Sequence, residues 1–228
     1  MRATVLFTGG KDSHFSLYWA VLQGFEIPVL ASLIPSYDYS MLYHRPVEDI
    51  LKLQSRALNI PLEIEYVHDP EDELAALKRL LSRIIDNYNI EAVFSGAILS
   101  DFQRMRFSMI AEELGLLSYT PLWRIDQEKY MFELVDSGFE ILITSISTLG
   151  LGPGFVGRVL SRDDVEAIIR RAKRYGFNPA FEGGEAETLV VYMPLYRYRL
   201  RVEGETLKRG PYNYEFVIRR AWIEDHRK

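Results

Sequence analysis

The sequence predicts an α/β fold, a parallel sheet with helices on both faces, followed by a smaller C-terminal α+β domain. Three observations lead to this prediction. Short apolar runs alternate with amphipathic helical segments through the first half. A Gly-Gly turn follows the first apolar run. Near Thr120 the pattern changes to two helices mixed with β-like runs. We therefore expect one domain at residues 1–120 and a second at residues 121–228.

The elements of the first half follow from local signals. Ala3–Phe7 is an apolar run typical of a buried parallel strand. Ser13 is expected to cap the helix that follows, and Gly24 to end it. Further strands are expected at Pro28–Ile34, Leu62–Val67 and Glu91–Phe94, and further helices at Pro46–Leu58, Asp69–Tyr88 and Asp101–Leu114. Ligands of parallel sheets bind at the carboxyl ends of the strands, so the loops Thr8–Ser13 and Ser95–Ser100 should share one edge.

The second half mixes helices, strands and a glycine-rich segment. Helices are expected at Asp126–Asp136 and Arg162–Tyr175, and strands at Glu140–Ser147, Leu189–Met193, Tyr196–Val202 and Tyr214–Ile223. The glycine-rich segment Gly150–Gly157 lies too far from the first strand to be a dinucleotide fingerprint. We interpret it as a mobile lid, with a plain connector as the alternative.

Composition narrows the classes of protein. The chain has 228 residues, of which 48% are hydrophobic, and it contains no stretch of the ~20 apolar residues that would cross a membrane. Its N-terminus is typical of a strand rather than a targeting leader, so we expect a cytoplasmic protein. The net charge of -5 argues against a broad nucleic-acid surface, and no direct nucleic-acid binding is expected. Arg197, Arg199 and Arg201 alternate, which fits either a solvated strand face or a docking surface for an acidic macromolecule.

The loop Thr8-Gly9-Gly10-Lys11-Asp12-Ser13 has the properties of a phosphate-binding turn. Adjacent glycines allow a turn whose successive backbone N–H groups form an anion site at a helix N-terminus. Lys11 adds a positive charge, Asp12 suits Mg²⁺, and Thr8 and Ser13 offer hydroxyls. The spacing is not that of a Walker A motif. The alternative is a strand-to-helix turn with an exposed lysine.

A second loop should lie beside the first. Ser95 and Gly96 follow a predicted strand, and Asp101 and Arg104 begin the next helix. We assign Ser95, Gly96 and Asp101 to the nucleotide site. Arg104 or Arg106 is placed to neutralise charge developing on the α-phosphate, and we assign the role to Arg104. For either arginine, a surface salt bridge is the alternative.

Four segments resemble one known family. The Thr8–Ser13 loop resembles the pyrophosphate loop of the N-type ATP pyrophosphatases, the PP-loop superfamily. Ser95–Arg106, Pro121–Trp123 and Glu182–Thr188 resemble segments of diphthine–ammonia ligases, the last matching their Glu-Gly-Gly-Glu-x-x-Thr pattern. The resemblance implies a Rossmann-like sheet of the adenine-nucleotide α-hydrolase type.

The resemblance also implies an activity. Members amidate diphthine, a modified histidine of translation elongation factor 2, to diphthamide with ammonium, releasing AMP and pyrophosphate. ATP and Mg²⁺ are then the cofactors, with Lys11, Asp12 and Arg104 catalytic and Asp12 holding the metal. The chain has no cysteine, so it lacks a cysteine-dependent glutaminase and cysteine-bound clusters, and ammonium or a partner must supply nitrogen.

An acceptor site is implied by the same resemblance. It would contain Trp123, Glu182, Gly183, Gly184, Glu185 and Thr188. Tyr43 is added as an aromatic candidate. His44 is added because its loop follows the second strand at the predicted active edge, with a surface or capping residue as the alternative. The carboxylates of Glu182 and Glu185 suit a cationic substrate, and aromatic rings suit its trimethylammonium group. An acidic surface turn is the alternative. Phe181 stands where many members have Gly, and Ala186 stands where many have Tyr or Phe. These two departures should change the shape of the substrate pocket more than the ATP chemistry.

Other functions stay open at this point. A PP-loop ligase with the same turn would amidate another small carboxylic acid or modify tRNA. Outside enzymes, the chain would be an ATP-binding module without turnover. A homo-oligomer is compatible with the sequence, which does not define the oligomeric state.

Overall fold

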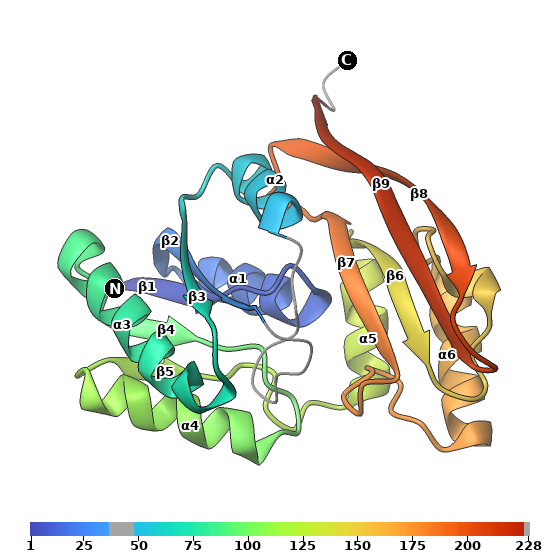
Figure 1. Cartoon of the computed structure of the whole chain (residues 1–228), viewed down its shortest axis with the longest axis horizontal. Helices are drawn as coiled ribbons and strands as arrows, with labels where there is room; N and C mark the ends of the chain where they lie inside the picture. Colours follow the sequence, from blue (N-terminus) through green and yellow to red (C-terminus); the bar gives the residue numbers. More distant parts are fainter. Residues whose placement is uncertain (37–47, 226–228) are drawn as a thin grey trace. The chain divides into compact units, whose positions relative to one another are not determined.

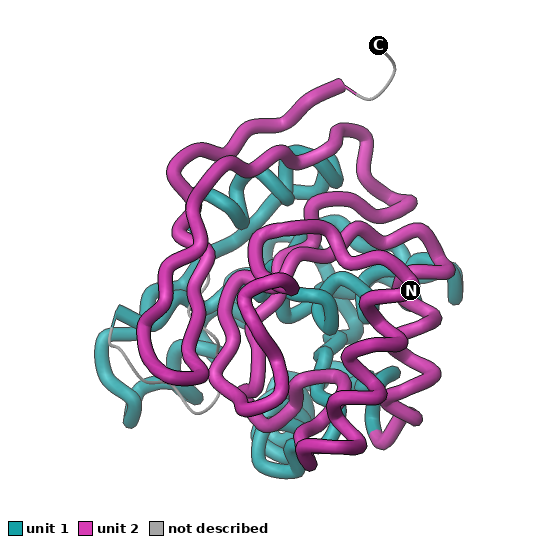
Figure 2. The backbone as a smooth tube through the Cα atoms, turned by 90° about the vertical axis from the view of Figure 1, so that its right-hand side faces the viewer, with its two compact units in different colours: residues 1–123 teal, residues 124–228 magenta. Residues whose placement is uncertain are grey.

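The computed structural model describes residues 1–36 and 48–225 (Figure 1). The chain divides into two compact units, Met1–Trp123 and Arg124–Lys228 (Figure 2). Tyr43 and His44, assigned to the acceptor site, and Pro46, assigned to a helix, lie outside the described residues.

The first unit is built on a five-stranded sheet with the order β3-β2-β1-β4-β5. All of its strands are parallel, which confirms the predicted parallel sheet. Its strands are β1 (Arg2–Leu6), β2 (Glu26–Pro35), β3 (Leu62–Val67), β4 (Ala92–Phe94) and β5 (Leu117–Tyr119). Its helices are α1 (Lys11–Leu22), α2 (Glu48–Leu58), α3 (Glu73–Tyr88) and α4 (Asp101–Glu113), with a 3₁₀ turn η1 (Pro70–Asp72) before α3. Helices α1 and α2 cover one face and α3 and α4 the other (Figure 1).

The core of this unit explains why the sheet forms. Residues of β2 that face α3 are fully or nearly fully buried, among them Val29, Ala31 and Leu33. Helix α3 presents apolar residues at the spacing of one helical face, Leu77, Leu80, Leu81 and Ile84. Burying such side chains on both faces of a parallel sheet is the main stabilising term, at roughly 25 cal/mol per Å² of apolar surface.

The second unit contains a four-stranded sheet with the order β7-β6-β9-β8 and antiparallel pairing. Its strands are β6 (Glu140–Ser147), β7 (Ala186–Tyr192), β8 (Tyr198–Lys208) and β9 (Asn213–Asp225). Its helices are α5 (Gln127–Asp136) and α6 (Arg162–Tyr175), with a 3₁₀ turn η2 (Pro153–Phe155). This arrangement confirms the smaller α+β part of the predicted fold.

Three local expectations change. Helix α1 begins at Lys11 with Gly10 as its N-cap, so Ser13 lies in the first turn and is not the cap. Strand β5 was not predicted, because Leu117–Tyr119 is too short to show a period. Strand β7 begins at Ala186, three residues earlier than expected, and so contains the end of the Glu182–Thr188 segment.

Two of the three alternating arginines, Arg199 and Arg201, lie in β8 and are paired with carboxylates of other strands. Arg199 bonds to Glu140 of β6, and Arg201 Nε lies 2.7 Å from Glu224 Oε2 of β9. On β9, Arg219 Nε donates to Glu205 at 3.0 Å. These cross-strand ion pairs fit a solvated strand face better than an unopposed basic docking surface.

Within the described parts of both units, each helix is too short or too polar to cross a bilayer.

Candidate active site

The phosphate turn connects β1 to α1 and depends on its first glycine. Gly9 has φ +82, a left-handed conformation that side chains disfavour. A Cβ atom added there would lie 2.7 Å from Oε1 of Gln54. Gly10, the N-cap, is extended with φ -84 and ψ 174. Backbone conformation and close packing thus both require Gly9.

The two hydroxyls of the turn brace it from within. Ser13 Oγ accepts hydrogen bonds from the backbone N–H and the Oγ1 of Thr8, both at 3.3 Å. The same Oγ donates to the carbonyl of Gly10 at 3.1 Å. Thr8 and Ser13, expected to contact phosphate, therefore also hold the turn in shape.

Lys11 is buried, which excludes the exposed-lysine alternative. Its side chain is 4% exposed, and Nζ lies 2.9 Å from Oδ2 of Asp12, whose side chain is 28% exposed. Burying an ammonium group is costly unless it is paired, and the carboxylate compensates this cost. A single partly exposed carboxylate fits Mg²⁺, which binds proteins through one or two carboxylates together with substrate phosphates. Among the residues described, three or more His, Cys, Asp or Glu nowhere gather into a metal-binding group.

The second loop packs directly against the first turn of α1. A Cβ atom on Gly96 would lie 2.8 Å from the carbonyl carbon of Asp12 and 3.0 Å from the N of Ser13. The hydroxyl of Ser16 donates to the carbonyl of Ser95 at 3.2 Å. Because β1 and β4 are parallel neighbours, both loops leave the sheet at one edge, as expected.

Arg104 lies in the first turn of α4 and contacts two other predicted site residues, Asp101 and Trp123. Ser100 caps α4 through the N–H of Gln103, and Asp101 begins the helix. Arg104 Nη2 donates to Asp101 Oδ1 at 3.1 Å, and its guanidinium lies 4.6 Å from the centre of the Trp123 ring. The salt bridge expected as the alternative is therefore present. The aromatic contact additionally holds the guanidinium in one orientation.

His14, which the sequence analysis did not assign to the site, lies in the first turn of α1 and supports the phosphate turn. The ring is fully buried, 4.6 Å from the ring of Phe7, and Nδ1 lies 2.9 Å from the carbonyl oxygen of Gly10. Because a carbonyl only accepts, we assign the proton to Nδ1. Burial lowers the pKa of His14 from 6.5 to about 3, against the opposing effect of the Gly10 bond. Its imidazole is therefore neutral at physiological pH.

Gln54 is the second residue that sequence reasoning missed. It is fully buried on α2, and its Nε2 donates to the carbonyl of Gly9 at 3.0 Å. A signal was present, since Gln54 lies on the buried face of α2 that Ile50, Leu51, Ala57 and Leu58 form. A lone amide on an apolar helix face indicates a specific buried partner.

Glu185 braces the predicted acceptor turn. Its Oε1 accepts from the backbone N–H of Asn178 at 2.8 Å and from the Asn178 side chain at 3.0 Å. Its Oε2 accepts from the N–H of Gly183 at 2.8 Å. The carboxylate expected to bind substrate thus holds the turn together. Glu182 is partly exposed, and Gly183 and Gly184 are exposed.

The backbone of the acceptor turn explains one departure from the family pattern. Phe181 has φ +67, which glycine adopts without strain, and yet its side chain is buried at 5% exposure. Burial of the ring offsets the strained backbone. Ala186 and Thr188 lie in β7, opposite Ile146 and Ile143 of β6.

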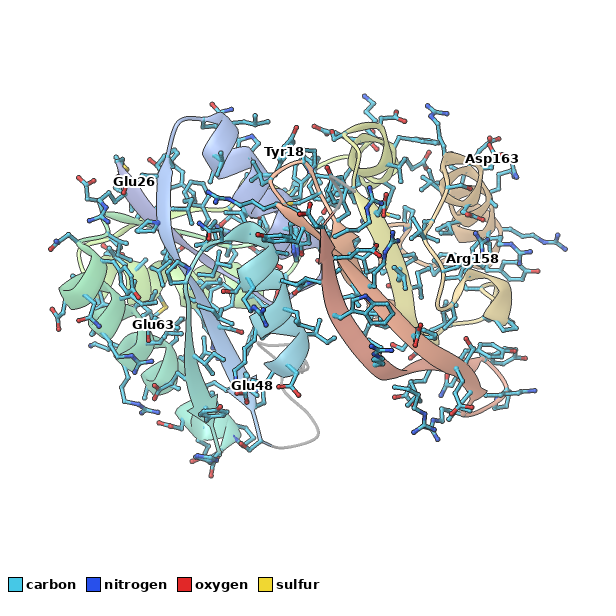
Figure 3. The ribbon with its side chains drawn as sticks, turned by 90° about the horizontal axis from the view of Figure 1, so that it is seen from above. Tyr18, Glu26, Glu48, Glu63, Arg158 and Asp163 are labelled. Atoms are coloured by element: carbon cyan, nitrogen blue, oxygen red, sulfur yellow. The ribbon has the colours of Figure 1, made fainter. Side chains whose placement is uncertain are left out.

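The glycine-rich segment is a structured connector. Gly157 N–H donates to the carbonyl of Ile143 at 2.9 Å, and Arg171 donates to the carbonyl of Gly150 at 2.7 Å. Arg158, labelled in Figure 3, donates to the carbonyl of Gly154 at 2.6 Å. These bonds tie the beginning, middle and end of the segment, so the connector fits better than the mobile lid.

The parallel sheet and the Gly-Gly-Lys-Asp-Ser turn at its carboxyl edge define an ATP-binding α/β protein of the PP-loop class. The family model "Diphthamide synthase N-terminal domain" matches residues 1–118, and "Diphthamide synthase C-terminal domain" matches residues 126–225. The chain belongs to the diphthamide synthase family.

Curated relatives agree with this assignment. The diphthine–ammonia ligase of Schizosaccharomyces pombe is 33% identical over 88% of this chain and 36% of its own length. The diphthine–ammonia ligases of Rattus norvegicus and Homo sapiens are each 30% identical over 89% of this chain and 83% of their own length. The chain therefore spans about a third of the fission-yeast relative and most of the two mammalian relatives.

Proposed function

We propose that this protein is a diphthine–ammonia ligase, which amidates the diphthine residue of translation elongation factor 2 with ammonium at the expense of ATP. One observation carries the proposal: the diphthamide synthase models match both compact units, and the first unit holds an intact phosphate turn. Diphthine–ammonia ligases of three organisms are similar over most of this chain.

The phosphate turn would bind the pyrophosphate part of ATP. The backbone N–H groups of Gly10 and Lys11 donate to phosphate oxygens, and the Lys11 ammonium moves from Asp12 to the phosphates. Asp12 would hold Mg²⁺, which supplies positive charge to the same oxygens. Ser95 and Gly96 border the turn, and we assign them and Asp101 to the nucleotide site.

The reaction has two displacements. A carboxylate oxygen of diphthine attacks the α-phosphorus, the bond to the β-phosphate breaks, and pyrophosphate leaves. Ammonia then attacks the acyl carbon of the adenylate, AMP leaves, and the nitrogen gives up a proton. Arg104, held by Asp101 and Trp123, neutralises charge on the α-phosphate. Catalysis is then mainly positioning and charge neutralisation.

The acceptor residues divide into contacting and supporting roles. Glu182 is the carboxylate we assign to the cationic acceptor, with Gly183, Gly184 and Thr188 beside it in sequence. Glu185 supports their turn through its hydrogen bonds. Trp123 has the Arg104 guanidinium against its ring and supports that residue. Tyr43 and His44, outside the described residues, remain assigned to the acceptor.

The test is an acceptor assay. The protein is incubated with elongation factor 2 carrying diphthine, with ATP, Mg²⁺ and ammonium, while pyrophosphate release and the mass of the modified peptide are followed. We expect pyrophosphate release that needs both acceptor and ammonium. If AMP forms only with a small carboxylic acid or with tRNA, the proposed substrate is wrong and that acceptor takes its place. ATP binding without acceptor-dependent pyrophosphate release would make the protein a binding module.

A further inference from the structure

Two buried polar side chains lie behind the glycine pair of the phosphate turn. Gln54 Nε2 donates to the carbonyl of Gly9 at 3.0 Å, and His14 Nδ1 donates to the carbonyl of Gly10 at 2.9 Å. Both side chains are fully buried. We propose that Gln54 and His14 are positioning residues that orient the two peptide groups of the turn before ATP binds. The inference rests on the proposed function, because it concerns how the turn receives pyrophosphate.

The carbonyl of Gly10 is the more heavily anchored of the two. It accepts from His14 Nδ1, from the Ser13 hydroxyl at 3.1 Å and from the backbone N–H of His14 at 3.3 Å. The Gly9 carbonyl is held by a side chain 45 residues away. Each peptide plane is thus fixed by a donor on a packed helix, α1 or α2.

The direction of the N–H groups follows from peptide geometry. The described residues contain no cis peptide bond, and a trans peptide points its C=O and its N–H in opposite directions. The Gly9 carbonyl shares its plane with the N–H of Gly10, and the Gly10 carbonyl shares its plane with the N–H of Lys11. Since both carbonyls point at buried donors, both N–H groups point the opposite way, where successive amides form an anion site.

Glycine makes this anchoring necessary. A glycine pair has a wide choice of backbone conformations, and selecting one on binding costs entropy. Side chains that select the conformation in advance remove that cost and so raise affinity. A purely structural role would instead satisfy buried polar groups without altering the affinity for pyrophosphate.

The experiment compares three substitutions in the full chain. His14→Leu and Gln54→Leu remove the anchors. Thr4→Val is the matched control, because it removes another buried hydrogen bond of the same unit, from Thr4 Oγ1 to the carbonyl of Val29 at 3.0 Å, away from the turn. Affinity for inorganic pyrophosphate and for Mg²⁺–ATP is measured by calorimetry, together with the unfolding temperature.

We expect Gln54→Leu to bind pyrophosphate roughly tenfold or more weakly, the scale of one misdirected charge-assisted hydrogen bond. His14→Leu should weaken binding in the same direction by a smaller factor, because the Gly10 carbonyl keeps its bonds from the Ser13 hydroxyl and the backbone N–H of residue 14. Thr4→Val should lower the unfolding temperature and keep the affinity. His14→Asn should restore binding, since its Nδ2 takes the place of the Nδ1 donor. The proposal is overturned if the folded leucine variants bind like wild type, or if Thr4→Val weakens binding equally.

A second measurement works even if a leucine variant does not fold. In the wild-type protein, pyrophosphate should shift the amide resonances of Gly10 and Lys11 strongly, and unmoved resonances would also overturn the proposal. Failure of the wild type to bind ATP would instead remove the proposed function. If the wild type binds ATP and the leucine variants bind it with the same affinity, only the positioning role of Gln54 and His14 is overturned.

Discussion

Thr8–Ser13 and Gly150–Gly157 are both glycine-containing segments between a strand and a helix. They differ in the atoms that pack around their glycines. Gly9, Gly150 and Gly157 all have positive φ. In the first segment, buried donors hold the carbonyls of Gly9 and Gly10. In the second, added Cβ atoms on Gly150 and Gly157 would lie 2.5 Å from the rings of Tyr175 and Phe216. Glycine content alone therefore does not define a phosphate loop; the atoms packed around the glycines do.

Removing the cation of the first segment should have the largest effect. We expect Lys11→Ala to lower acceptor-dependent pyrophosphate release by about a hundredfold or more, because it deletes the positive charge that we propose for binding the phosphates. Gly154→Ala in the second segment is the matched control, since nothing lies within 4 Å of its added Cβ and its φ is not positive. Pyrophosphate release is measured for both; equal activity of the two variants would contradict the assigned role of the loop.

The second segment should respond in stability instead. Gly157→Ala combines a left-handed backbone with a clash against Phe216, and we expect the free energy of unfolding to fall by about 2–4 kcal/mol. Urea unfolding measures this loss. Turnover per folded molecule should stay at the wild-type level, and a parallel loss of turnover would mean that this segment, too, belongs to the active site.

The two carboxylates of the acceptor turn should differ in the same way, because we assign Glu182 to the acceptor and Glu185 to support of the turn. Glu185→Gln should lower the free energy of unfolding by about 1–3 kcal/mol, because it weakens three hydrogen bonds to Asn178 and Gly183. Glu182→Gln should leave stability unchanged and raise the KM for the protein acceptor, with the KM for ATP unaltered. Urea unfolding and steady-state kinetics on both variants test this pair, and the reverse pattern would exchange the two roles.

The smallest expected effect is the acid response of the second segment. Hydrogen bonds from Arg158 lower the pKa of Asp164 from 3.8 to about 2, with further help from Ser161 at the N-cap of α6. A depressed pKa means that the stabilisation is present above pH 3.8 and is lost as pH falls toward 2.

Because the Arg158 side chain is 49% exposed, we expect this contribution to be screened to about 1 kcal/mol or less. Urea midpoints measured across this pH range should fall less steeply for Asp164→Asn than for wild type. Identical slopes would show that the pair contributes nothing to the acid response.

Much of the fold could be predicted because its signals are local. Leu62–Val67, Glu140–Ser147 and Arg162–Tyr175 begin and end where periodicity and capping residues placed them. Strand β5 could not be found, because three residues carry no period and pairing with β4 decides their conformation.

In the candidate site, too, local features could be predicted from the sequence and long-range contacts could not. The sequence alone determined the strand, turn and helix and predicted their role in phosphate binding, because the Gly-Gly-Lys-Asp-Ser run and its two flanking elements are contiguous. Only the tertiary structure decided that Lys11 is buried against Asp12, that Gln54 holds Gly9 and that Glu185 holds its own turn. Those roles depend on which buried groups meet after helices pack on the sheet, and a buried polar group takes the partner that packing brings to it. Sequence spacing does not encode that partner.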